Sequence, residues 1–185
     1  MARLIHLNGP PGIGKSTIAN LYVEARPGTL NLDIDEVRRL IGGWRQDFIG
    51  AGNLVRPIAL NMAETHLRQG LDVVMPQFLC SLSEIELFEA AATTSESQFL
   101  EIVLMDSKDR SVDRFTARGD DAEETWHREV QEIVRKNGGV TYLAEMYDQL
   151  VEVIRLRPSA VVVTSEAGAI DATFRQVSAV LNRVM

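Results

Sequence analysis

The sequence contains one cysteine, Cys80, among its 185 residues. One thiol can neither form a disulfide within the chain nor build a thiolate metal cluster. Long apolar runs are also missing, and none approaches the roughly 18 residues of a membrane-spanning helix. The amino-terminal MARLIHLNG lacks the long apolar core of a signal peptide. We therefore expect a cytoplasmic protein with no membrane partner.

An excess of positive charge is missing as well, because the formal net charge is −7. Such a chain has no general electrostatic reason to bind nucleic acid or an anionic membrane, although a local basic groove remains possible. Hydrophobic residues make up 45% and charged residues 24%, as is ordinary for a globular protein. The length fits one domain with a real core, so we expect a single domain over residues 1–185.

Five short apolar runs predict buried strands, and their near-continuous hydrophobicity is typical of strands covered on both faces. Helical patterns separate them, which predicts an α/β fold with a parallel sheet and right-handed crossovers. The helical stretch 107–157 is longer than one crossover requires, and we expect a mobile lid or an inserted subregion there. The predicted strands are residues 3–8, 29–34, 71–75, 99–105 and 160–164; the predicted helices are residues 15–25, 35–42, 53–69, 81–94, 107–118, 121–136, 141–156 and 169–184.

The stretch GPPGIGKST, residues 9–17, matches the phosphate-loop pattern GxxxxGK[ST] through Gly9, Gly14, Lys15 and Ser16. It follows a predicted strand and opens a predicted helix, as the motif requires. Glycines let backbone N–H groups turn inward around phosphate oxygens, and the helix N-terminus adds partial positive charge. Lys15 can reach the β- and γ-phosphates, and the Ser16 hydroxyl can bind Mg²⁺. The alternative, a Gly-Pro turn before an amphipathic helix, explains less of this context.

Two other nucleotide signatures are absent from the sequence. A GTPase needs a guanine-reading NKxD, which does not occur. An ATPase of the ABC or AAA type needs a strand that ends in Asp, usually followed by Glu, to hold Mg²⁺ and activate water. The third predicted strand instead runs into Pro76 and Gln77. The sequence therefore argues against a machine driven by ATP hydrolysis, while ATP over GTP remains unproved.

Two aspartates and an arginine stand where the second predicted strand ends, in NLDIDEVRR, residues 31–39. Asp35 could simply cap the next helix, and Asp33 could be an ordinary polar residue. Alternation along a strand would instead aim both aspartates to one side, where they can face the phosphate loop.

Near the predicted lid, VDRFTAR places Arg114 and Arg118 four residues apart on one helical face. These arginines could contact a base and a phosphate, or could form a solvated basic face.

The motif order and strand spacing resemble those of the small P-loop kinases, which include adenylate, shikimate and gluconate kinases, chloramphenicol phosphotransferase, zeta toxin and polynucleotide kinase domains. The resemblance covers most of the chain. It implies a P-loop NTPase fold, with a five-stranded parallel sheet in the order 2-3-1-4-5, helices on both faces and a helical lid. It also implies ATP on the first loop, with contacts from Gly9, Gly12, Ile13, Gly14, Lys15, Ser16 and Thr17.

The same resemblance implies roles for the aspartates and arginines. DRFTAR is similar to the family's lid signature, so Arg114 would pack on adenine and Arg118 would touch phosphate. LDIDEVR is similar to a D-x-D form, which implies Asp33 for the Mg²⁺ shell and Asp35 for the acceptor hydroxyl. It is also similar to a D-x-x-R form, which implies Asp35 as base with Arg38 nearby. Which aspartate is the base stays open, and Asp35 is our choice.

The acceptor side departs from the family, because MPQFLC replaces the acidic or glycine-rich signature that often follows strand three. Gln77 and Phe78 nevertheless stand at the carboxyl end of that strand, where α/β sheets bind ligands. In GGWRQDF, residues 42–48, Trp44 could form a substrate wall or could be a packing residue. Together with Arg38, these are the predicted substrate residues.

We therefore expect a kinase that uses ATP and Mg²⁺ to phosphorylate a hydroxyl of a small molecule, such as an antibiotic, sugar, nucleoside or metabolite. Asp35 would take the acceptor's proton, Ser16 and Asp33 would serve the metal, and Lys15 and Arg118 would stabilise the transferring phosphate. A polynucleotide 5′-hydroxyl kinase and a regulatory protein that binds nucleotide without acceptor turnover are the alternatives. The sequence leaves the acceptor and the oligomeric state open.

Overall fold

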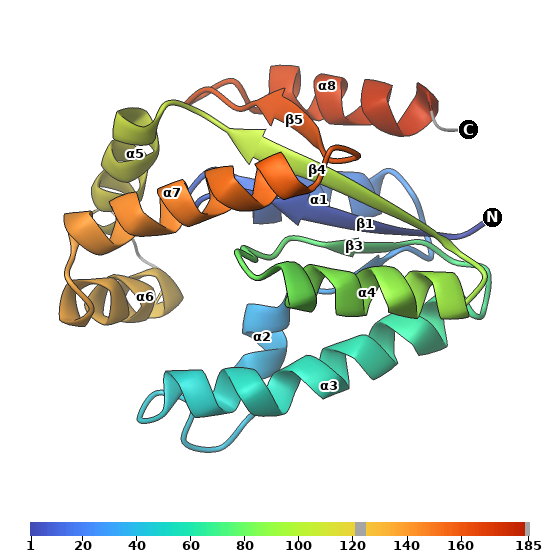
Figure 1. The fold of residues 1–185 in the computed structure, drawn as a ribbon, viewed down its shortest axis with the longest axis horizontal. Coiled ribbons are helices and arrows are strands. Elements are labelled where there is room, and N and C mark those ends of the chain that lie inside the picture. Colours follow the sequence, from blue (N-terminus) through green and yellow to red (C-terminus); the bar gives the residue numbers. More distant parts are fainter. Residues whose placement is uncertain (121–124, 184–185) are drawn as a thin grey trace.

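Five parallel strands form the central sheet of the computed structural model, in the order β2-β3-β1-β4-β5 (Figure 1). The structure describes residues 1–120 and 125–183, with the backbone alone for residues 118–120 and 125–127. The strand order and the all-parallel pairing confirm the predicted fold class. The strands are β1 Arg3–Asn8, β2 Leu30–Asn31, β3 Val73–Met75, β4 Gln98–Met105 and β5 Val161–Thr164.

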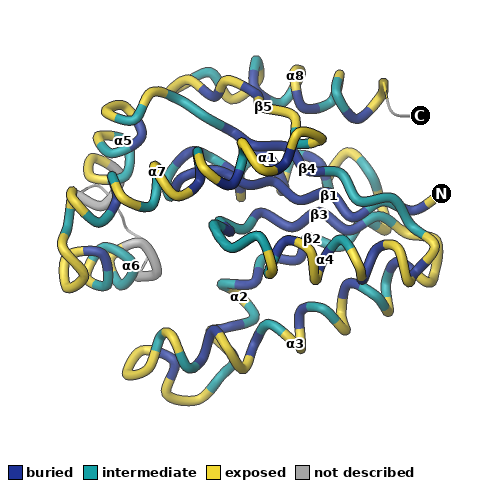
Figure 2. Tube along the Cα trace, viewed as in Figure 1, coloured by how far each residue is buried: buried dark blue, intermediate teal, exposed yellow. Residues whose placement is uncertain are grey.

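Helices cover both faces of this sheet, which explains why the strand sequences are almost continuously apolar. One hydrophobic cluster joins the sheet to α1 and α8, and a second joins it to α3 and α4. In Figure 2, β1 and β3 run as a buried layer between these helices, whereas β5 at the edge of the sheet is mostly exposed. The helices are α1 Lys15–Glu24, α2 Ile34–Arg38, α3 Phe48–Leu67, α4 Leu82–Thr94, α5 Lys108–Asp120, α6 Thr125–Lys136, α7 Val140–Leu156 and α8 Ile170–Arg183.

The second strand is much shorter than predicted, and the prediction over 29–34 was wrong at its carboxyl end. The last parallel bond along this stretch runs from Leu32 N to Val74 O, at 2.8 Å. Asp33 then accepts a hydrogen bond from the backbone N–H of Asp35 and caps α2. An aspartate in this position favours helix over strand because it satisfies an N–H that the first turn leaves free. The helix therefore starts before Asp35, and the two aspartates do not alternate along a strand.

The region after β4 contains three helices that contact one another, α5, α6 and α7. They lie at one end of the molecule in Figure 1, beyond the carboxyl ends of the strands, and α7 then returns along the sheet. The predicted helix at 121–136 begins in residues 121–124, which lie outside the described residues. Every helix in the described ranges is too short or too polar to cross a membrane.

A buried polar cluster lies inside the otherwise apolar sheet. His6 is fully buried on β1, with Nε2 2.9 Å from the carbonyl oxygen of Gln77 and Nδ1 3.7 Å from Glu101. A carbonyl can only accept, so Nε2 carries the proton. Glu101 in turn accepts from Arg157 at 2.8 Å. Burial lowers the pKa of His6 to about 4, and the charges of Lys15 and Arg157 add to this effect.

This lowered pKa predicts that folding stability falls as the pH drops from 6.5 to about 4. Unfolded His6 binds a proton in this window and folded His6 does not, so proton binding stabilises the unfolded state. The stabilising contribution of neutral His6 to folding is complete above pH 6.5. It is about 3 kcal/mol, and all of it is lost well below the folded pKa of about 4. Urea unfolding of the wild type and of His6→Gln at several pH values measures it. The glutamine keeps a donor for Gln77 but cannot titrate, so parallel pH curves for the two proteins would contradict the prediction.

Candidate active site

The phosphate loop connects β1 to α1 and lies against both β4 and α5. Gly9, Gly12 and Gly14 have positive φ angles of 143°, 78° and 105°, a region that side chains disfavour. A Cβ at Gly9 would lie 2.4 Å from the carbonyl oxygen of Leu104, and one at Gly12 would lie 3.1 Å from Cα of Phe115. Glycine is therefore required both by the backbone conformation and by the close approach of neighbouring backbone.

Lys15 begins α1 and is 9% exposed. Its ammonium donates to the carbonyl oxygens of Gly9 and Pro10, at 2.9 and 3.0 Å, so it closes the phosphate loop from inside. The same charge acts on Asp35 and favours its carboxylate form. A phosphate in the loop would meet this ammonium together with the backbone N–H groups of the helix start.

Ser16 and Asp33 meet beside Lys15, although 17 positions separate them in the chain. The Ser16 hydroxyl donates to Oδ2 of Asp33 at 3.3 Å, while Oδ1 of Asp33 caps α2. A hydroxyl and a carboxylate are hard oxygen ligands, and Mg²⁺ binds few protein groups while it keeps waters and phosphate oxygens. These two residues therefore fit a magnesium site of this kind. In the described residues, no larger cluster of three His, Cys, Asp or Glu side chains offers another.

Asp35 lies in the first turn of α2 and faces Arg38, whose guanidinium donates to Oδ1 at 2.6 Å. The structure corrects the suggestion that Asp35 caps this helix, because Asp33 does so. Burial raises the pKa of Asp35, against the opposing charges of Arg38 and Lys15 and a hydrogen bond from the Gln77 side chain. Burial also raises the pKa of Asp33, and the neighbouring charge of Asp35 adds to it. Without nucleotide or metal, the carboxylates of Asp33 and Asp35 therefore hold protons more tightly than those of exposed aspartates do.

A cavity of about 370 Å³ opens from the phosphate loop toward α3, α4 and the helices α5–α7. At one end it is polar and is bordered by Lys15, Ser16, Asp35, Arg38 and Gln77. The rest of its wall is mainly apolar and aromatic, and most of these wall residues were not predicted from the sequence. No motif marks them, because they come from five separate helices and one loop. They include Phe48, Phe78, Phe88, Phe115, Val134, Tyr142 and Met146.

Trp44 is not among the residues that line this cavity, unlike the other predicted substrate residues Arg38, Gln77 and Phe78. Its side chain is buried at 5% exposure, and the guanidinium of Arg45 stacks over the ring, 4.5 Å from its centroid. The position matches the packing alternative for Trp44. Arg45 also pairs with Glu129, so this loop contacts α6.

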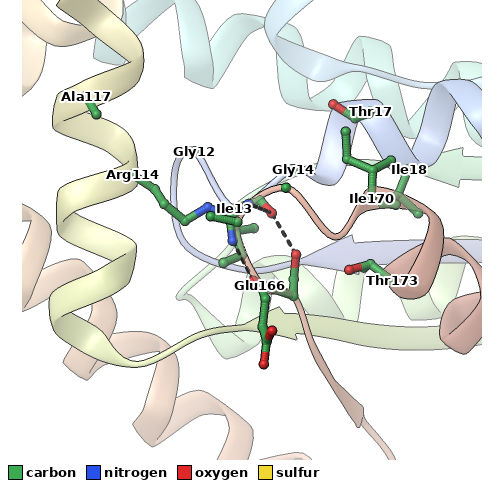
Figure 3. Close-up of a pocket in the computed structure, with 13 residues that line it drawn as sticks. Gly12, Ile13, Gly14, Thr17, Ile18, Arg114, Ala117, Glu166, Ile170 and Thr173 are labelled. Atoms are coloured by element: carbon green, nitrogen blue, oxygen red, sulfur yellow. Dashed lines mark hydrogen bonds between the residues drawn. The ribbon is translucent and has the colours of Figure 1, made fainter.

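A second cavity, of about 310 Å³, lies on the other side of the phosphate loop (Figure 3). Arg114 reaches into it from α5 and donates to the carbonyl oxygens of Ile13 and Ser165. The loop after β5 completes the wall, a contribution that the sequence analysis missed, although the carboxyl end of a parallel strand is a general signal for ligand contact. The side chain of Arg118 lies outside the described residues. The lining includes Gly12, Ile13, Gly14, Thr17, Glu166, Ile170 and Thr173.

The chain is similar to one protein family and to several solved structures. Residues 4–137 match the family model described as AAA domain. No curated protein matches the chain. Among solved structures, the tunicamycin resistance protein of Deinococcus radiodurans is 15% identical, with a TM-score of 0.64 over 98% of this chain and 96% of that one. A gluconokinase from Sinorhizobium meliloti 1021 is 17% identical, with a TM-score of 0.67 over 99% and 93%. The deoxyadenosine kinase of M. mycoides is 15% identical, with a TM-score of 0.58 over 98% and 100%.

Proposed function

Because the chain belongs to the AAA domain family and has the fold of the small P-loop kinases, we propose that it is an ATP-dependent phosphotransferase. It transfers the γ-phosphoryl group, with Mg²⁺, to a hydroxyl of a small molecule. The observation that carries this proposal is the shared boundary of the phosphate loop and the 370 Å³ cavity, where Lys15, Ser16 and Asp35 all lie. A hydroxyl placed in this cavity faces both the loop and a carboxylate.

This site fits the transfer of a phosphoryl group to an organic acceptor better than the hydrolysis of ATP, despite the name of the family. A hydrolysing site must place a water with a carboxylate at the end of a neighbouring strand, but β3 runs into Pro76 and Gln77. The carboxylate comes from α2 instead, and the space in front of it is a mainly apolar cavity large enough for an organic acceptor. Such walls favour an acceptor body over bulk water.

In the proposed reaction, the acceptor oxygen forms a bond to the γ-phosphorus as the bond to the β-phosphate oxygen breaks, and ADP leaves. Asp35 accepts the hydroxyl proton, and its raised pKa makes it a stronger base than an exposed aspartate. Arg38 holds that carboxylate in place at 2.6 Å. Lys15 exchanges its loop carbonyls for phosphate oxygens and neutralises charge on the transferring group.

Ser16 and Asp33 would hold the Mg²⁺, which supplies charge neutralisation on the phosphates when bound. Asp33 would act through a water of the metal shell, and its second oxygen continues to cap α2. Arg114 borders the smaller cavity, which we assign to the nucleotide base. The region α5–α7 acts as the lid of a single kinase domain and, with Arg118, closes over the phosphates to limit loss of ATP to water.

The test is a screen of hydroxyl-bearing compounds with ATP and Mg²⁺, read by mass spectrometry of the phosphorylated product. Uncharged aromatic alcohols, sugars, nucleosides and a 5′-hydroxyl oligonucleotide form separate arms. The aromatic wall predicts that alcohols with an apolar body react best. Product from the oligonucleotide alone would favour the polynucleotide kinase, and nucleotide binding with no product in any arm would favour the regulatory protein.

Replacing Arg114 by alanine is expected to raise the KM for ATP about tenfold, since the stacking of a guanidinium on a base contributes on the order of 1 kcal/mol or more. Its bonds to Ile13 and Ser165 also shape the base cavity. The KM for the acceptor should stay near the wild-type value, because Arg114 does not border the larger cavity. Arg110→Ala on the same helix, where Arg110 is exposed, is the control. Equal changes in both KM values would contradict the assignment.

A further inference from the structure

Two polar side chains on one face of β1 hold the same segment of the chain. His6 and Asn8 are two residues apart on the strand, so they point to the same side of the sheet. Both are fully buried, in a strand whose other inward residues are apolar. His6 binds the carbonyl oxygen of Gln77, and Asn8 binds both backbone groups of Leu79. Burying such polar groups costs free energy unless they are hydrogen-bonded. The backbone groups that they bind therefore indicate which part of the chain these two side chains hold in place.

The segment that they hold has left the sheet. The pairing of β3 with β1 ends where His6 lies opposite Met75, and the next residue, Pro76, has no N–H to donate. From there the side chains of β1 replace the backbone ladder. The Asn8 amide donates to the Leu79 carbonyl at 2.9 Å and accepts from the Leu79 N–H at 3.1 Å, as a neighbouring strand would.

The same Asn8 oxygen also holds the phosphate loop. It accepts from the N–H of Gly9 at 2.8 Å, and Gly9 in turn accepts from the ammonium of Lys15. We call the three hydrogen bonds of Asn8, two to Leu79 and one to Gly9, the amide clip. The clip therefore ties the first residue of the phosphate loop to the segment that forms a wall of the larger cavity.

That wall carries a group of the proposed reaction. Gln77 and Asp35 both border the larger cavity, and the carbonyl of Gln77 is held by His6. Residues 76–80 all border the larger cavity. A displacement of this segment would move Gln77 relative to both Asp35 and the phosphate loop. Distances between donor and acceptor of a phosphoryl group matter strongly, and a 1 Å error can cost on the order of a hundredfold in rate.

We propose that Asn8 is a positioning residue of the phosphoryl transfer, and that His6 supports it. The amide clip sets the distance between the phosphate loop and the acceptor wall at residues 77–79. Neither side chain borders either cavity, so both act through the backbone of other residues. This inference rests on the proposed phosphotransferase function.

The test uses the full-length chain and compares Asn8→Ala, His6→Leu and His6→Gln. Asn8→Ala and His6→Leu should lower kcat for transfer by about tenfold to a hundredfold. The KM for ATP should change little in His6→Leu, which leaves the phosphate loop untouched. His6→Gln should recover most of the rate, because its amide can again donate to Gln77. The uncoupled hydrolysis of ATP, relative to transfer, should rise in both damaging variants, since a displaced wall admits water.

Leu181→Ala is the matched control for general damage to the core. Leu181 is fully buried in the other hydrophobic cluster with Ile5 and Leu7, whose side chains point to the opposite side of the sheet from His6 and Asn8. At a temperature well below its unfolding midpoint, this variant should keep the wild-type kcat. Wild-type kcat in Asn8→Ala and His6→Leu would overturn the inference. A loss that merely follows stability, with Leu181→Ala reduced to the same degree, would overturn it too.

Amide hydrogen exchange separates this inference from the proposed function. If the wild type phosphorylates nothing, the proposed function fails, yet the clip can still be measured. Asn8→Ala should then speed exchange at the N–H groups of both Gly9 and Leu79, while amides in α8 remain as in the wild type. Unchanged exchange at these two positions would show that Asn8 does not tie the loop to the wall, whatever the protein catalyses.

Discussion

Replacing Lys15 by methionine is expected to lower phosphoryl transfer about a thousandfold, the scale reported for removing one preorganised charge-stabilising group. Methionine keeps an unbranched apolar stem but removes the ammonium that lies within 3.0 Å of two loop carbonyls. The transferring phosphoryl group then loses its nearest cation in the loop. The charge that favours the carboxylate form of Asp35 is lost as well, so the proposed base becomes harder to ionise.

Initial rates with a confirmed acceptor, together with nucleotide binding by calorimetry, measure this effect. Lys136→Met is the matched control, since Lys136 is exposed at the end of α6 and pairs with Glu132, whose side chain is exposed as well. The same chemical change there should leave transfer unaltered. Wild-type transfer by Lys15→Met would remove the phosphate loop from the reaction and with it the proposed function.

Replacing Asp35 by asparagine is expected to lower transfer by about 10² to 10⁴-fold, the range attributed to general acid–base catalysis. The side chain keeps its shape but can no longer take a proton. Nucleotide binding should be retained, because Asp35 does not border the cavity assigned to the base. Separate measurement of ATP affinity and of transfer rate therefore distinguishes a base from a nucleotide ligand.

Glu36→Gln provides the control for Asp35→Asn, as it makes the same chemical change one residue later on the same helix. Glu36 is exposed and pairs with Arg39 rather than with Arg38. Some loss of stability is expected in Asp35→Asn alone, because the buried Arg38 keeps its charge and loses its carboxylate partner. Unchanged transfer in Asp35→Asn would exclude Asp35 as the base.

Much of the fold could be predicted because its signals are local. Strand β1 has the predicted bounds, since RLIHLN is largely buried on both faces and the glycine loop ends it. The predicted strands 71–75, 99–105 and 160–164 each differ from β3, β4 and β5 by two residues or fewer. The α3 helix begins at Phe48 rather than 53, because the Asp47 side chain accepts from the N–H of Gly50 and caps it early.

The conformation of the aspartate pair could not be predicted from the local sequence. The sequence identified Asp33 and Asp35 as chemical residues, but it placed them on a strand, with both side chains to one side. In the structure Asp33 is a helix cap that reaches Ser16, whereas Asp35 lies two residues further on, in the first turn of α2, and reaches Arg38. Whether an aspartate ends a strand or starts a helix depends on a few hydrogen bonds of similar strength, which alternation alone cannot rank.

By itself, the sequence determined that this chain builds a phosphate loop, because the loop needs only consecutive residues: glycines for positive φ, and Lys15 and Ser16 at the helix start. Tertiary structure alone decided what faces that loop. The larger cavity is assembled from α2, α3, α4 and α5–α7, and the amide clip joins residues 71 positions apart. Such contacts depend on how helices pack across the sheet. A pattern of neighbouring residues carries no record of that packing.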